Sequence, residues 1–246
     1  MNGMQKAIKV IAICFAIFII TNIISALLFG VSILVKTTSP VKYTEDYTNT
    51  YGYIENIDIN IGATNLIIKE GTEFKLKLNE VSKNFKETYQ NNTLKINEDN
   101  KWLYRKNTSS VILYIPKNHL LKEVLIESDT GKVELDGISA SSFKINQGAG
   151  IVIINNSKLN NLDLEAGIGK IYINSEITGN SKIESGIGKV SLILNNKEEY
   201  QLDITKGIGS IYIDKVSQPN KTIYGTGNNN LKIESGIGEI NINFNN

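Results

Sequence analysis

The sequence predicts an all-β fold: a single-domain parallel β-helix, or solenoid-like stack of strand–Gly-x-Gly–strand repeats, preceded by one transmembrane α-helix. Three observations predict it. Glycines recur at a near-constant spacing in the second half of the chain, aliphatic and polar residues alternate around each of them, and a long uncharged apolar run lies near the N-terminus. A period near 20 residues is typical of units that bury their apolar faces by stacking on one another.

The N-terminal apolar run comprises Val10–Val35, which contain no charged residue. About 20 apolar residues are enough for a helix to cross the bilayer. A cleaved signal peptide is the alternative, but its apolar stretch is usually about 7–15 residues long. We therefore expect an anchoring helix at residues 10–36, which makes the protein single-pass in the cell membrane.

The expected anchor divides the chain into further parts. Residues 1–9 form a short basic tail, which we expect in the cytoplasm, although Lys and Arg are balanced across the two flanks of the helix. Residues 37–53 are polar and rich in Thr and Tyr, which is typical of a stalk or linker. Residues 54–246 are expected to form one β domain outside the cytoplasm, with regular repeats at 124–246.

Each repeat is defined by one anchor glycine. The anchors are Gly131, Gly150, Gly169, Gly188, Gly209 and Gly238. A second glycine stands two residues before the five later anchors, at Gly148, Gly167, Gly186, Gly207 and Gly236. Val, Ile or Leu occupies the positions two and four residues after the anchor and five residues before it in all six repeats. This alternation is typical of half-buried strands, so each repeat is expected to be a strand, a glycine turn and a second strand.

The glycines mark the expected turns, because glycine permits positive φ and close backbone approach. Between the paired glycines lie Ala149, Ile168, Ile187, Ile208 and Ile237, and we expect these side chains to fill the inside of the turn. Six residues before the anchors the charge alternates, through Lys144, Asp163, Lys182, Asp203 and Lys232. If the repeats stack in parallel and in chain order, this pattern places opposite charges on neighbouring layers about 4.8 Å apart.

The first half of the β domain is less regular. Short alternating segments predict strands at Ile57–Ile61, Leu66–Ile68, Phe74–Leu78, Leu94–Ile96 and Val111–Ile115. We expect them to be degenerate repeats that cap the stack.

Composition excludes several function classes. The 26 Lys and Arg nearly balance the 25 Asp and Glu, so there is no electrostatic reason to expect a nucleic acid partner. The single His and single Cys are too few for a His/Cys zinc site, and Cys14 lies in the apolar run. Asp129-Thr130-Gly131 matches the D-T-G of aspartic proteases, but the required second carboxylate motif is missing. The sequence therefore predicts no catalytic, metal-binding or cofactor-binding residues, and no cofactor.

Two rows of side chains are candidates for binding. An acid recurs four residues before the anchor, at Glu127, Glu165, Glu184 and Glu234, where a solvated face is favoured over a Ca²⁺ site. Three residues after the anchor stand Ile153, Tyr172 and Tyr212. They form either an exposed stripe for a partner or a surface covered by a neighbouring loop.

The segment Val111–Gly137, with its Ile115-Pro116 step, and the units LDLEAGIGKIYI and SKIESGIGKVSL resemble the bacterial "putative adhesin" family, also described as toastrack. The resemblance covers roughly residues 54–246. It implies a β-solenoid-like envelope protein behind an N-terminal membrane helix, without established catalytic residues. Some relatives accompany envelope-stress signalling systems.

Three functions follow as hypotheses. The first is a non-enzymatic, membrane-anchored module for adhesion that binds a protein or a wall polymer. The second is an accessory regulator or sensor of an envelope-stress signalling system. The third is a self-assembling β-helical scaffold, for which self-association through the ends of the stack is required. The polar final strand, EININFNN, disfavours polymerisation.

Overall fold

The computed structural model describes residues 46–81, 85–98 and 109–245. The expected cytoplasmic tail and transmembrane helix lie outside these ranges. Among the residues that the structure describes, no helical segment reaches the length and hydrophobicity of a membrane span. Residues Tyr43–Asn246 form one compact unit.

The described part of the chain is all-β, as predicted, and its 15 strands belong to one continuous hydrogen-bonded sheet. The strands are β1 (Tyr47–Tyr51), β2 (Asn56–Ile61), β3 (Asn65–Gly71), β4 (Phe74–Asn79), β5 (Phe85–Gln90), β6 (Thr93–Glu98), β7 (Ser110–Pro116), β8 (Leu120–Asp136), β9 (Ser139–Asn160), β10 (Leu162–Thr178), β11 (Asn180–Asn195), β12 (Tyr200–Ile213), β13 (Val216–Gln218), β14 (Thr222–Tyr224) and β15 (Asn229–Asn245). A short 3₁₀ turn, η1 (Lys197–Glu199), precedes β12.

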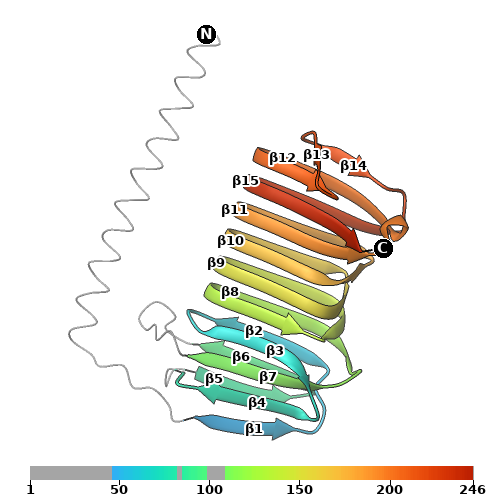
Figure 1. The fold of residues 1–246 in the computed structure, drawn as a ribbon. Coiled ribbons are helices and arrows are strands. Elements are labelled where there is room, and N and C mark those ends of the chain that lie inside the picture. Colours follow the sequence, from blue (N-terminus) through green and yellow to red (C-terminus); the bar gives the residue numbers. More distant parts are fainter. Residues whose placement is uncertain (1–45, 82–84, 99–108, 246) are drawn as a thin grey trace, which may run out of the picture. The chain divides into compact units, whose positions relative to one another are not determined.

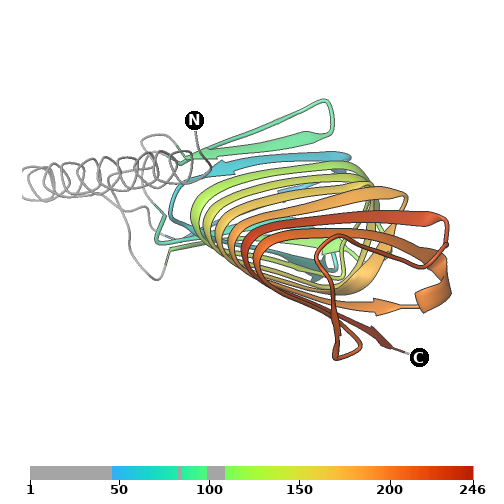
Figure 2. The same ribbon diagram turned by 90° about the horizontal axis from the view of Figure 1, so that it is seen from above.

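Six long strands, β8 to β12 and β15, are the predicted repeats. Each bends at its glycines into a first and a second arm, and we call one such bent strand a rung. Neighbouring rungs pair in parallel along both arms. The arms lie on opposite sides of a flattened coil that encloses the core, which is visible along the stack in Figure 2.

The core consists of the predicted aliphatic ladders. All 18 Val, Ile and Leu residues at the three conserved positions of the repeat are at most 2% exposed. Complete burial stabilises each such side chain by about 1.5–3 kcal/mol relative to exposure. The period-two pattern therefore identified both the strands and their inward faces.

The bends require glycine because neighbouring rungs approach closely there. A Cβ on Gly186 would lie 2.4 Å from the carbonyl oxygen of Gly167. A Cβ on Gly188 would lie 1.7 Å from the carbonyl oxygen of Gly169, and Gly188 also has φ of +151°. The first glycine of the pair thus provides space, and the anchor provides both space and a backbone conformation that other residues avoid.

The rungs do not follow chain order at the C-terminal end. β15 lies between β11 and β12, so the last repeat is inserted and β12 becomes the outermost rung (Figure 1). The predicted alternation of charges is therefore wrong at this point, because Lys182 lies beside Lys232 instead of Asp203. Each of these lysines pairs instead with a glutamate two residues further along its own strand, at 2.8 Å and 3.0 Å.

The N-terminal end has the mirrored arrangement. β2 and β3 form a rung that stacks on β8, while β6 and β7 form the rung beyond it although they follow later in the chain. In the sequence, β4 and β5 come between these two rungs. In the structure they lie at the outer edge, where β4 pairs antiparallel with β7 and β5 pairs antiparallel with β6. The less regular first half is thus the cap of the stack, as predicted.

Short antiparallel strands close both ends. β1 pairs with β4 at one end, and β13 and β14 pair with β12 at the other. Short, antiparallel edge strands oppose the addition of further strands. The structure therefore argues against the end-to-end growth that the scaffold hypothesis requires. The predicted reason was wrong, because the polar final strand is β15, which lies inside the stack and not at its edge.

β1 lies within residues 37–53, which the sequence predicts as a stalk. Tyr47–Tyr51 instead pair with Phe74–Leu78 of β4. Thr and Tyr favour strands, and β4 offers them an edge with free backbone groups. The β domain therefore begins before residue 54.

Candidate interaction surface

The described residues offer no arrangement suited to metal binding: they contain no group of three or more His, Cys, Asp and Glu side chains that could hold an ion. His119 packs edge-on against the rings of Tyr53 and Phe74, with ring centroids 5.2 Å and 4.8 Å away. Its Nε2 lies 2.8 Å from the carbonyl oxygen of Ile54. These contacts give His119 a structural position in the cap.

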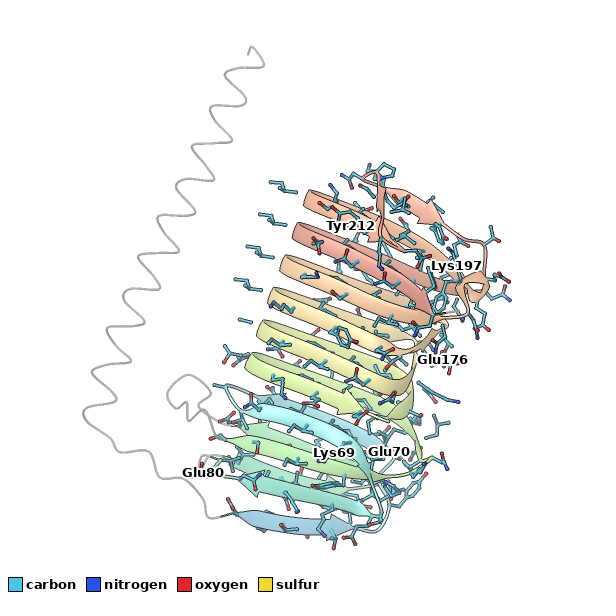
Figure 3. All side chains as sticks on the ribbon, viewed as in Figure 1. Lys69, Glu70, Glu80, Glu176, Lys197 and Tyr212 are labelled. Carbon is cyan, nitrogen blue, oxygen red and sulfur yellow. The ribbon has the colours of Figure 1, made fainter. Side chains whose placement is uncertain are left out.

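A groove of about 450 Å³ lies on the face formed by the second arms. Tyr172 and Tyr212 stand on its rim, and the position of Tyr212 on this face is visible in Figure 3. Two rungs separate them, with Ser191 and Asn241 at the equivalent positions. Three rung spacings amount to about 14 Å. Of the predicted stripe, Ile153 lies directly beside Tyr172, whereas Tyr212 lies across the groove.

The floor of the groove is polar and already ordered. Lys189 Nζ lies 2.8 Å from Glu239 Oε1, and Asn241 Nδ2 donates to the same oxygen. The hydrogen bond from Lys189, followed by that from Asn241, lowers the pKa of Glu239. Lys215 also lines the groove and forms no ion pair within the described part of the chain. The site thus has aromatic walls, hydroxyl and amide groups beside the aliphatic Ile193, and a small excess of positive charge.

The isoleucines between the paired glycines do not fill the inside of the bend, and that prediction is wrong. Ile168, Ile187, Ile208 and Ile237 are 57%, 48%, 69% and 47% exposed. The alternation of buried and exposed residues stops at the bend. Several residues lie there between the last inward-facing residue of the first arm and the first inward-facing residue of the second arm. In Figure 3 side chains project from the left edge of the stack, where the rungs bend.

A second groove runs beside these isoleucines on the first-arm face. It has a volume of about 650 Å³ and continues into another depression of about 300 Å³ that shares Glu165 and Gly167. The first glycines of the pairs line it because they have no side chain to fill the space. The recurring glutamates line it as well, so this groove is acidic as well as apolar.

A family model described as Toastrack DUF4097 matches residues 120–243, about half of the chain. The chain belongs to the toastrack family. The matched region contains all six anchor glycines and both grooves, which confirms the family resemblance drawn from the sequence. No curated protein matches the chain.

The fold resembles that of a solved structure. The crystal structure of a "putative cell adhesion protein" from Clostridium sporogenes is 18% identical, with a TM-score of 0.53, and the alignment covers 83% of this chain and all of the other. A "putative adhesin" from Parabacteroides merdae is 14% identical, with a TM-score of 0.36 over 83% and 97% of the chains. A "putative lipid binding protein" from Parabacteroides distasonis is 15% identical, with a TM-score of 0.36 over 82% and 97%. Of these three, the first supports the fold and none carries a function to this chain.

In this toastrack chain, sequence reasoning found the tyrosines but missed the groove between them. Ser191 and Asn241 reach the floor from β11 and β15, which become neighbours only because β15 is inserted. Neither the residue types of Ser191 and Asn241 nor their positions in the repeat indicated that they line a groove. The acidic row was found, but its position beside an apolar edge was not.

Proposed function

We propose that this toastrack protein is a non-enzymatic module of the cell envelope that binds a wall polymer through the Tyr172–Tyr212 groove. The predicted N-terminal helix anchors it in the cell membrane, and the β domain lies outside the cytoplasm. The groove is the observation that carries the proposal. It is open and elongated, which suits a polymer better than a small molecule enclosed in a pocket.

The chemistry of the groove favours a glycan chain. A sugar ring has an apolar face that can pack on an aromatic ring and hydroxyl groups that can bond to amide and hydroxyl side chains. Tyr172 and Tyr212 offer the rings, and Ser191 and Asn241 offer the polar groups between them. The uncompensated Lys215 favours a polymer that carries acidic groups.

Co-sedimentation with purified cell-wall polymer tests this function. The fragment Tyr43–Asn246 is suitable because it contains the whole compact unit and its core. We expect Tyr172→Ala and Tyr212→Ala each to weaken binding at least fivefold, which is typical of aromatic anchor residues. Tyr47→Ala is the matched control, since Tyr47 is 43% exposed on β1, outside the groove.

Equal binding by all three variants would contradict the groove assignment. Failure of the unaltered fragment to bind wall polymer would contradict the function itself. Retention of a membrane-protein ectodomain by the fragment in that case would support the regulator hypothesis instead.

A further inference from the structure

The exposed isoleucines form an unbroken ladder along one edge of the stack. Ile168 pairs with Ile187, Ile187 with Ile237, and Ile237 with Ile208. The inserted rung therefore continues the ladder, although it comes last in the chain. Four layers span about 14 Å. Within the described residues, no segment covers this edge, and all four side chains are about half exposed or more.

The bend itself does not require isoleucine at this position. Thr130 and Ala149 occupy the equivalent position in the two preceding rungs, in register with the ladder. Their bends have the same backbone course, with an anchor glycine at positive φ. The isoleucines thus contribute an apolar surface that the fold does not need, and a contiguous exposed apolar patch is typical of an interaction site.

We propose that two copies of the chain pair side by side, ladder against ladder, about a two-fold axis parallel to the stack. The regular spacing argues for a second copy as the partner. A row of side chains repeating every 4.8 Å is matched along its whole length by another row with the same repeat. A second copy presents that row with the same shape and chemistry.

The charges beside the ladder select the orientation. Glu165 and Glu184 lie on the first-arm face, whereas Lys170 and Lys189 lie on the second-arm face. A two-fold axis parallel to the stack places the first-arm face of one copy beside the second-arm face of the other, so that Glu meets Lys on the same rung. An axis perpendicular to the stack reverses the order of the rungs, so that Glu184 meets Glu234 and Glu165 meets Thr205 instead of a lysine. Glu165 and Lys170 form no ion pair within the described part of their own chain, so both are available.

The β15 rung does not oppose this pairing, although it carries acids on both sides of the ladder. Glu234 is held by Lys232 at 3.0 Å, and Glu239 is held by Lys189 at 2.8 Å. Each acid is therefore already compensated within one copy.

The parallel orientation also fits the ends of the stack. Antiparallel strands close both ends, so lateral contact is the remaining route to self-association. Parallel copies present β1 at the same end, as required for two chains that are anchored in one membrane by their N-terminal segments. The ladder is narrow compared with the roughly 800 Å² per partner of a stable interface. Pairing is therefore expected to be weak in dilute solution and strong where the membrane raises the local concentration.

Disulfide cross-linking of the full chain in its membrane tests the proposal. Cys14→Ser removes the natural cysteine, and Ile168→Cys or Ile208→Cys then introduces one thiol at either end of the ladder. Each variant is expected to give cross-linked dimers upon mild oxidation. In an antiparallel pair the two copies of residue 168 would lie about 14 Å apart, which is beyond the roughly 7 Å between Cα atoms that a disulfide allows.

Val216→Cys is the control, since Val216 is an exposed apolar residue of β13 that lies beside Ile213, away from the ladder. Comparable cross-linking at Val216 would show random collision and overturn the proposal, as would the absence of dimers at both ladder positions. With Ile208→Cys as reporter, Ile168→Thr, Ile187→Thr and Ile237→Thr together should reduce dimers at least tenfold. Thr130 shows that this bend accepts threonine, so the triple variant is expected to fold. Its thermal melting curve checks that it does.

Charge reversal tests the orientation in the same reporter. Lys170→Glu should reduce cross-linking about two- to fivefold, in line with the strength of exposed ion pairs. The second change Glu165→Lys should restore it, because the reversed charges meet again only across a parallel pair. Failure of the double variant to recover would overturn the parallel orientation.

Discussion

Substitution of Gly188 by alanine tests the central feature of the fold, the close approach of rungs at the bend. Two costs add. The φ of +151° at Gly188 strains any residue with a Cβ, at about 1–3 kcal/mol. The new Cβ would also lie 1.7 Å from the carbonyl oxygen of Gly169, so the rungs must separate locally and lose backbone hydrogen bonds worth about 1 kcal/mol each.

If two such hydrogen bonds are lost, the expected loss for Gly188→Ala is about 3–5 kcal/mol in the free energy of unfolding. For a domain of this size, 1 kcal/mol corresponds to about 2–4 °C in melting temperature. Thermal and urea denaturation of the Tyr43–Asn246 fragment, followed by circular dichroism, should show a melting temperature lower by about 6–20 °C.

Three other glycines separate the two costs. Gly186→Ala introduces the close contact, at 2.4 Å from Gly167, without the positive φ. Gly131→Ala introduces the strain at φ of +117°, but its nearest neighbouring atom is 3.4 Å away, so about 1–3 kcal/mol is expected. Gly52→Ala meets nothing within 4 Å and should stay within about 0.5 kcal/mol of the unaltered protein. A loss at Gly188 no larger than at Gly131 would refute the in-register stacking of the bends.

Two further predictions concern the end of the stack where β12 and β15 meet. Tyr200, 1% exposed, accepts a hydrogen bond from the backbone N–H of Ile177 at 3.2 Å; Tyr200→Phe leaves that buried donor without its partner and should cost about 1–3 kcal/mol, measured by urea denaturation. Asp214 pairs with Lys197 at 2.8 Å and accepts from the backbone N–H of Phe244 at 2.9 Å, and the hydrogen bond from Lys197 is the largest cause of its lowered pKa. Because the unfolded chain binds a proton at Asp214 more tightly than the folded chain, this stabilisation is present near neutral pH and lost as the pH falls below about 4. Asp214→Asn should therefore lose less stability than the unaltered protein between pH 5 and pH 3, and identical pH profiles would contradict the pairing.

The regular part of the fold could be predicted because burial imposes a simple rule. A strand with one buried face must alternate, and glycine must occupy a bend where a Cβ would collide with the next rung. Ile171, Val190 and Ile211 satisfy that rule, and all three are buried. The rule depends only on residues within each repeat, so it can be applied to a single sequence without knowledge of the order in which the repeats stack.

The order of the last two rungs could not be predicted by the same rule. β12 and β15 carry the same aliphatic pattern, and either would pair with β11 in the same register. The insert between β12 and β15 is long enough for the chain to form the outermost rung first and then return to form the rung inside it. The length of the insert does not indicate which of the two rungs lies inside. The groove between Tyr172 and Tyr212 depends on that order and was therefore missed.

The direction of the isoleucines was missed for a different reason. An apolar residue at a turn between two glycines can face either side, since alternation stops where the backbone bends. Ile187 lies within such a bend, between Gly186 and Gly188, and its side chain is exposed. Hydrophobicity alone therefore gave the wrong side.

The mirrored ends have a consequence for how such proteins vary in height. Each end is built from an outer rung, its antiparallel strands and an inner rung that the chain places out of sequence. The rungs between them follow one another at 19-residue intervals. Duplication of one such unit within the gene would add a layer and lengthen the molecule by about 4.8 Å, while both termini kept their architecture. A duplication within either end would disrupt the exchange of rungs, so evolutionary change in length is expected in the middle of the chain.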